Sequence, residues 1–84
     1  MTINPLGVNI TEVSNGKVTV LYSYKAPVAA FIDGDVFVTD KQWSRTTTRH
    51  VYRWVNMRGF LVTATKPQEF FDTLLNGGNN ENIY

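Results

Sequence analysis

The chain has 84 residues, of which eight are basic, seven acidic and one histidine, and it has no cysteine. This length corresponds to a single domain. Without cysteine there are no disulfides and no cysteine-ligated metal site, and one histidine cannot form a histidine cluster. No glycine-rich phosphate loop or other catalytic, cofactor-binding or metal-binding motif is present. The composition therefore favours a non-enzymatic protein without a cofactor or metal.

No membrane segment or targeting signal is predicted. The start of the chain, Met1–Pro5, has neither the basic nor the apolar region of a secretory signal. The longest strongly apolar run, residues 28–32, is five residues long, whereas a transmembrane helix needs about 20. We therefore expect no membrane association.

The net charge of +1 hides an uneven distribution along the chain. Residues 1–40 carry a net charge of −2 and residues 67–84 one of −3. Residues 41–66 contain six basic residues and no acidic one. This middle segment is therefore positively charged, although the chain as a whole is nearly neutral. Its basic residues are Lys41, Arg45, Arg49, Arg53, Arg58 and Lys66.

The first half of the chain has the pattern of a β-hairpin. Asn15-Gly16 is a strong signal for a type I′ turn, because Asn and Gly best tolerate the positive φ angles that both central residues need. Apolar residues alternate with polar ones on both sides of this dipeptide, as in half-buried strands. The pattern predicts strands near residues 7–14 and 17–25.

A second hairpin is predicted around Asp33-Gly34 by the same logic. The run before it, residues 28–32, is apolar on both faces, which favours a central strand, and Pro27 stands at its start, where a missing N–H costs least. Val36–Val38 forms the fourth strand. These strands together make an antiparallel meander that ends near Thr39.

The period then changes to that of a helix over residues 45–57. Ser44 is a favourable N-cap and Gly59 a favourable end. At about 100° per residue, the helix has two distinct faces. The face predicted to pack on the sheet contains Val51, Trp54 and Val55. A different face carries Arg45, Arg49 and Arg53.

The last third of the chain predicts a short strand and a short helix. Phe60–Ala64 has the composition of a fifth strand. Thr65 and Gln68 have the spacing of a capping box, with Pro67 in the first turn of the helix. The apolar stripe of this helix is Phe70, Phe71, Leu74 and Leu75, and Asn76-Gly77 closes it.

The sequence thus predicts an α+β fold with an antiparallel meander of four or five strands, one amphipathic helix packed on it and a short C-terminal helix. A single domain is expected over residues 1–76, followed by a flexible tail over residues 77–84. A small SH3-like or Sm-like barrel has the same strand pattern and stays an alternative.

The basic residues of the middle segment are the candidate functional surface. They could contact a partner protein or a nucleic-acid backbone. The alternative is a solvated helix face whose arginines pair with Asp33, Asp35 or Asp40. The candidate set is Lys41, Arg45, Arg49, His50, Arg53 and Arg58.

Two further observations bear on function. Catalysis by His50 would need a nucleophile or carboxylate beside it, and the hydroxyl residues near it in sequence form no nucleophile motif. We therefore expect His50 to lie at the edge of the interface between helix and sheet.

Phe70 and Phe71 are adjacent in a predicted helix, so we expect that they cannot both face one core. This favours contact with a second copy of the chain.

Three segments of the sequence resemble small uncharacterised proteins encoded by tailed bacteriophages and their marine metagenomic relatives. The segments are Tyr22–Ile32, Trp43–His50 followed by Trp54, and Pro67–Phe71 followed by Leu74-Leu75. The resemblance implies a viral origin, and it implies no activity and no site residues. With no secretory signal or transmembrane segment predicted, we expect residence in the host cytoplasm or the virion.

The leading hypothesis is a phage accessory protein, not an enzyme, that acts by self-association or by binding a partner protein. The alternative is a nucleic-acid-binding module that uses the basic helix over residues 45–57, and an enzyme ranks third.

Overall fold

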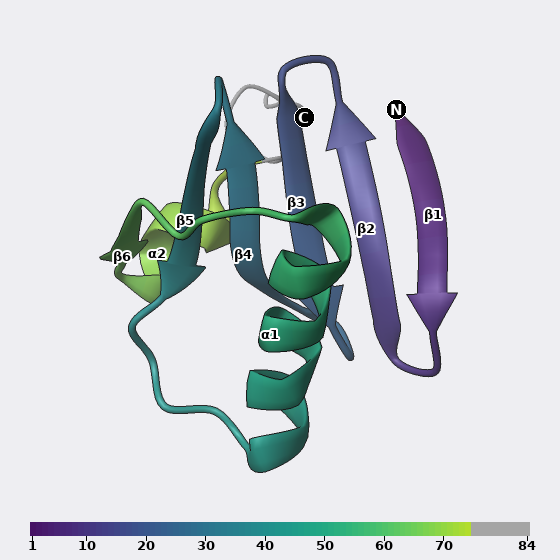
Figure 1. Cartoon of the computed structure of the whole chain (residues 1–84), viewed down its shortest axis with the longest axis vertical. Coiled ribbons are helices and arrows are strands. Elements are labelled where there is room, and N and C mark those ends of the chain that lie inside the picture. The colour runs from purple at the N-terminus through teal and green to yellow at the C-terminus, as the bar shows by residue number, and fades with distance from the viewer. Residues whose placement is uncertain (75–84) are drawn as a thin grey trace.

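Within residues 1–74, six strands form one sheet, with a helix on each side of it. The computed structural model describes residues 1–74 (Figure 1). Its elements are β1 (Thr2–Gly7), β2 (Ile10–Asn15), β3 (Val18–Ser23), β4 (Ala26–Ile32), β5 (Asp35–Thr39), α1 (Arg45–Arg58), β6 (Ala64–Lys66) and α2 (Gln68–Asp72).

The sheet is an open meander in which the strands lie in chain order from β1 to β6. All neighbours are antiparallel except β5 and β6, which run parallel because α1 carries the chain back between them. The strands at the two ends, β1 and β6, do not pair with each other, so the sheet is not a closed barrel. The α+β meander with one long and one short helix is confirmed.

The structure adds a strand that the sequence did not predict. The first predicted strand, residues 7–14, corresponds to β2, and the additional strand β1 precedes it over Thr2–Gly7. The two strands are joined by a turn at Val8 and Asn9, and Asn9 has a positive φ of 61°. Pro5 made β1 hard to predict, since proline is confined to edge strands, and β1 is an edge.

The two predicted hairpins form, and one turn lies one residue later than predicted. Asp33 and Gly34 have φ angles of 50° and 88°, as a type I′ turn requires. The prediction for Asn15-Gly16 was wrong in position, because Asn15 still pairs with Val18 and the loop is Gly16 and Lys17. Only Gly16 has a positive φ there, 63°, which fits a type II′ turn with glycine at its first central position.

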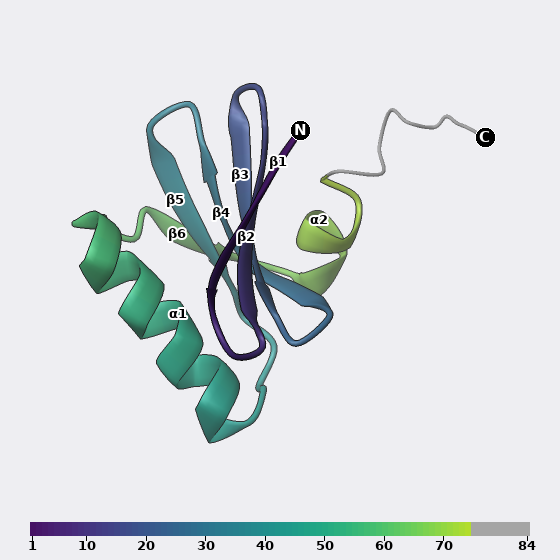
Figure 2. The ribbon, with the colours of Figure 1, turned by 90° about the vertical axis from the view of Figure 1, so that its right-hand side faces the viewer.

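The sheet has an apolar cluster on each face, and β4 contributes to both. Under α1 the buried residues are Ile10, Leu21, Val28, Ala29, Val36 and Trp54. Under α2 they are Val20, Ala30 and Phe71. Figure 2 shows the two helices on opposite sides of the sheet. The prediction that the apolar run 28–32 is a central strand is confirmed.

Helix α1 matches the predicted helix closely. The Ser44 hydroxyl accepts a hydrogen bond from the Thr47 N–H at 3.3 Å, and Gly59 ends the helix with a φ of 68°. Trp54 is fully buried against the sheet and Val55 is half-buried. Neither helix within residues 1–74 is long and apolar enough to cross a membrane.

The predictions for the segment after α1 were wrong in detail. The strand expected over residues 60–64 begins only at Ala64. Before it, Thr63 is hydrogen-bonded to β5 through both its side chain and its backbone. Its Oγ1 accepts from the Val36 N–H at 3.0 Å, and its backbone N–H donates to the Val36 carbonyl at 2.7 Å. Thr65 lies in β6, so it cannot cap α2, whose N-cap is Pro67 without a side-chain hydrogen bond.

The expectation that Phe70 and Phe71 cannot share a core was also wrong. Phe71 is fully buried, and Phe70 packs edge-on against Phe37 with 5.6 Å between ring centroids. Both rings belong to one apolar cluster, Phe71 as a buried member and Phe70 as a partly buried one. These residues therefore give no support to self-association. The predicted end of this helix and the tail, residues 75–84, lie outside the described residues.

The most deeply buried charge of the described residues is the carboxylate of Glu12 on β2, which is 3% exposed under α1. Its Oε2 accepts from the indole N–H of Trp54 at 2.6 Å and from Nε of Arg58 at 3.0 Å. Its Oε1 pairs with Nη2 of Arg58. We call Glu12, Trp54 and Arg58 the carboxylate cluster. It joins the sheet to the C-terminal half of α1.

We expect Glu12→Gln to lower the free energy of unfolding by about 3 kcal/mol, because the exchange removes the charge that pairs with Arg58 in a buried site. This is the low end of the range for buried pairs, since the Arg58 side chain is 41% exposed. Chemical denaturation measures the change. Asp40→Asn, at an exposed position, is the control and should change the free energy by less than about 0.5 kcal/mol. Equal effects of the two exchanges would contradict the role of the carboxylate cluster.

Candidate functional site

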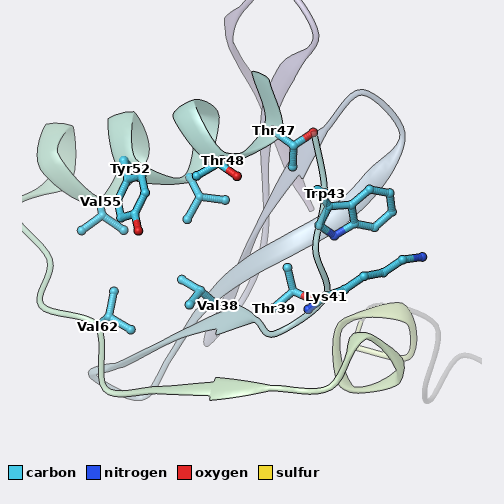
Figure 3. Close-up of a pocket in the computed structure, with 10 residues that line it drawn as sticks. Val38, Thr39, Lys41, Trp43, Thr47, Thr48, Tyr52, Val55 and Val62 are labelled. Carbon is cyan, nitrogen blue, oxygen red and sulfur yellow. The ribbon is translucent and has the colours of Figure 1, made fainter. Parts of the chain in front are cut away.

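An apolar groove of about 370 Å³ runs between α1 and the β5 side of the sheet. We call it the α1 groove. In Figure 3 Tyr52 and Val55 on α1 face Val38 on β5 and Val62 on the segment after α1, and Trp43 and Lys41 lie at one end. The remaining lining residues are Thr39, Thr47, Thr48 and Val51.

The local sequence explains why the groove stays open. Val38 faces α1 because it alternates with Phe37, which faces α2 on the other side of the sheet. Helix α1 packs on β3 through Trp54, which leaves the β5 side of the helix uncovered by the sheet. The segment of residues 59–63 crosses that side and supplies Val62.

Gln68, the first residue of α2, fixes the Trp43 end of the groove. Its side-chain N–H groups donate to the Pro27 carbonyl at 2.6 Å and to Asp72 at 3.0 Å. Its side-chain oxygen accepts from the Thr39 hydroxyl at 2.7 Å and from the Trp43 indole at 3.3 Å. From the sequence, Gln68 was predicted to be part of a helix cap. Its role at the groove could not be predicted, because its partners other than Asp72 lie 25 to 41 residues away.

Most polar groups that line the groove are already hydrogen-bonded within the protein. The Thr48 hydroxyl donates to the Ser44 carbonyl at 3.2 Å, and the Thr47 hydroxyl accepts from Ser23 at 3.0 Å. Two donors have no such partner among residues 1–74. They are the hydroxyl of Tyr52, a residue that is 63% exposed, and the ammonium group of Lys41, which lies 4.3 Å from the Trp43 ring centroid.

The predicted arginine face lies beside this groove. Arg45, Arg49 and Arg53 are exposed on α1, and the guanidinium of Arg53 lies near Gly7 of β1. The alternative expectation, that they pair with Asp33, Asp35 and Asp40, is not met, because within the described residues the one salt bridge joins Arg58 to Glu12. The three guanidinium groups therefore have no acidic partner among residues 1–74.

The other three candidate residues have separate environments. Lys41 lines the α1 groove, as described above. Arg58 points inward to Glu12 and belongs to the carboxylate cluster. His50 is half-buried at the interface between α1 and β3, where its ring is 5.9 Å from that of Tyr24. The six candidate residues do not form one surface.

His50 has a hydroxyl partner that sequence proximity did not reveal. Its Nδ1 lies 2.7 Å from the hydroxyl of Ser23 on β3, and that hydroxyl donates to Thr47 at 3.0 Å. A serine nucleophile must be accessible to a substrate, and Ser23 is only 2% exposed.

A second cavity of about 400 Å³ lies at the other end of the sheet face, beside the carboxylate cluster. Its polar groups bond with one another: Glu12 binds Arg58 and Trp54, and the hydroxyls of Ser14 and Thr19 are 3.1 Å apart. No group of three His, Asp or Glu side chains among residues 1–74 is arranged to hold a metal ion.

The fold and site define a small α+β protein with an apolar groove and a basic helix. The chain matches DUF8033, a family of unknown function, over residues 1–73, and it belongs to this family. No curated protein and no solved structure matches the chain significantly.

We expect Gln68→Ala to lower the free energy of unfolding by about 2 kcal/mol, because it removes several hydrogen bonds worth about 1 kcal/mol each. Chemical denaturation gives the value. The neighbouring exposed residue offers a matched control, and Glu69→Ala should change the free energy by about 0.5 kcal/mol or less. An effect of Gln68→Ala as small as that of the control would show that Gln68 does not fix the groove end.

Proposed function

We propose that this protein is a non-enzymatic accessory protein, encoded by a tailed phage, that acts by binding another protein at the α1 groove. The observation that supports this proposal is the groove itself, an apolar cleft that Tyr52 and Trp43 line and that is surrounded by basic groups without an acidic partner among residues 1–74. Pockets of about 300–1,000 Å³ with mostly apolar walls and a few polar groups are the usual form of binding sites. The phage origin rests on the resemblance of residues 20–75.

The proposal that the protein is not an enzyme is supported by the hydrogen bonding of its buried polar groups within the described residues. The buried ones, Glu12, Ser23 and Thr47, all bond to protein partners. The free groups of the groove, on Lys41 and Tyr52, have no second acid, base or nucleophile hydrogen-bonded to them among residues 1–74, as a catalytic site would need. Neither His50 nor Ser23 lines either cavity.

Partner binding by strand addition is disfavoured at both edges of the sheet. The edge strand β1 contains Pro5, which has no backbone N–H, and proline on an edge is a common barrier to further pairing. The opposite edge, β6, is three residues long. Recognition through side chains of α1 and its groove is therefore the better-supported mode.

A symmetric dimer through α1 is disfavoured by charge. In a two-fold contact the same surface patch meets itself. Arg45, Arg49 and Arg53 would then face the arginines of the second copy, and like charges in an interface cost several kcal/mol. This argues for a different protein as the partner, although the sequence hypothesis ranked self-association equally.

Site-specific photocrosslinking tests the proposal. We expect p-benzoylphenylalanine in place of Tyr52 to crosslink one defined protein in the organism that encodes the chain. The same group in place of Ile3, an exposed residue on β1, is the control and should not capture it. The partner, identified by mass spectrometry and purified, should bind the wild-type chain at least tenfold more tightly than Val62→Trp. Crosslinking of the same proteins from both positions, or of none, would overturn the proposal.

Nucleic-acid binding is a second candidate, favoured by the three unpaired arginines on one face of α1. Three phosphate contacts would make log K fall with log salt concentration with a slope of about −3 on duplex DNA. Fluorescence anisotropy with labelled single- and double-stranded DNA and RNA at two salt concentrations measures this slope. The candidate fails if no salt-sensitive binding is seen, or if Arg49→Glu with Arg53→Glu leaves binding unchanged.

A further inference from the structure

We propose that the ligand of the α1 groove is an acidic protein segment that inserts one bulky apolar side chain and places carboxylates on Lys41, Tyr52 and the neighbouring arginines. This inference rests on the proposed function and specifies the chemistry of its partner. It is carried by three properties of the groove: its apolar volume, its unpaired donors and the charge around it.

The apolar part of the groove fits a side chain. Val38, Val51, Val55 and Val62 form its walls, and Trp43 lies at one end. A volume of about 370 Å³ is at the lower limit for small-molecule and cofactor sites, which suits an anchor side chain better than a whole cofactor. Such anchors in pockets carry most of the binding energy at protein interfaces.

The unpaired polar groups select the chemistry beside the anchor. The Lys41 ammonium has three donors and no acceptor, and the Tyr52 hydroxyl has one donor. Neither has a hydrogen-bond partner within the described residues, and Lys41 meets only the face of Trp43. A ligand therefore has to supply acceptors, and a carboxylate supplies them with opposite charge.

The charge around the groove favours several carboxylates. No lining residue is acidic, and residues 41–66 contain no acid at all. At about 100° per residue, Arg45 lies next to Tyr52 around α1 and Arg49 follows it. Arg53 is further round, on the side of α1 where its guanidinium lies near Gly7 of β1. The acidic groups of the ligand should thus meet Lys41, Arg45 and Arg49 more than Arg53.

A synthetic peptide tests the inference directly. The probe is a fluorescein-labelled segment of ten residues in which Glu and Asp surround one central Phe. We expect saturable binding to the full chain by anisotropy at physiological salt. Replacing Phe by Ser, or all Glu and Asp by Gln and Asn, should each weaken binding about tenfold or more, because the apolar anchor and the charge pairs are both lost.

Matched variants of the protein locate the binding site. Val62→Trp fills the groove at an exposed position, whereas Leu61→Trp places the same ring on the neighbouring residue, which does not line the groove and is 88% exposed. We expect the first exchange to weaken peptide binding at least tenfold and the second less than twofold. Lys41→Glu with Arg45→Glu should weaken binding more than Arg53→Glu does. Circular dichroism of each variant confirms that it folds.

Three outcomes would overturn the inference: no binding at millimolar peptide, equal binding of the Gln and Asn peptide, or equal effects of Val62→Trp and Leu61→Trp. The proposed function would survive any of these if Tyr52 crosslinks a partner whose binding depends on the groove but not on charge. Absence of both peptide binding and a crosslinked partner would overturn both.

Discussion

The buried carboxylate of Glu12 is the interaction on which the arrangement of the helix depends. A charge that is 3% exposed is stable only when its oxygens are fully paired, and both oxygens of Glu12 accept hydrogen bonds from α1. Trp54 and Arg58, the donors, are one helical turn apart, so together they set the height of α1 on the sheet and its rotation. Apolar packing alone is non-directional and would leave both less well defined.

The rotation of α1 determines what the helix offers to other molecules. With Trp54 on the sheet, Arg45 and Arg49 must face solvent, and Tyr52 must lie at the boundary between them and the α1 groove. Gln68 plays the matching role at the other side, because it binds β4, β5 and Trp43 at once. Structural polar groups thus surround a groove whose own free groups are the donors of Lys41 and Tyr52. The structural polar groups around the groove are hydrogen-bonded within the protein, whereas, among residues 1–74, those of Lys41 and Tyr52 are free to bind another molecule. This difference is the physical basis for proposing a binding protein.

Local signals in the sequence were sufficient to predict much of the fold but little of the candidate site. Asp33-Gly34 and Gly59 act through their own backbone geometry, and Ser44 acts through a side-chain hydrogen bond to Thr47, three residues later. The second hairpin and the ends of α1 could therefore be predicted. The arginine face followed from helical periodicity. The pairs Glu12 with Trp54, Ser23 with His50 and Gln68 with Pro27 join residues 27 to 42 positions apart. No local pattern encodes such pairs, and for that reason Arg58 and His50 were grouped with a surface to which they do not belong.

Hydrogen exchange of the two tryptophan indole protons tests the central claim, that a buried carboxylate fixes α1 on the sheet. The Trp54 indole N–H bonds to Glu12 in the core, whereas that of Trp43 bonds to Gln68 at the part-buried groove end. In NMR spectra recorded in deuterated buffer, the Trp54 proton should persist until the whole domain unfolds, and the Trp43 proton should exchange earlier by local opening. Exchange of the Trp54 proton as fast as that of Trp43 would contradict the account.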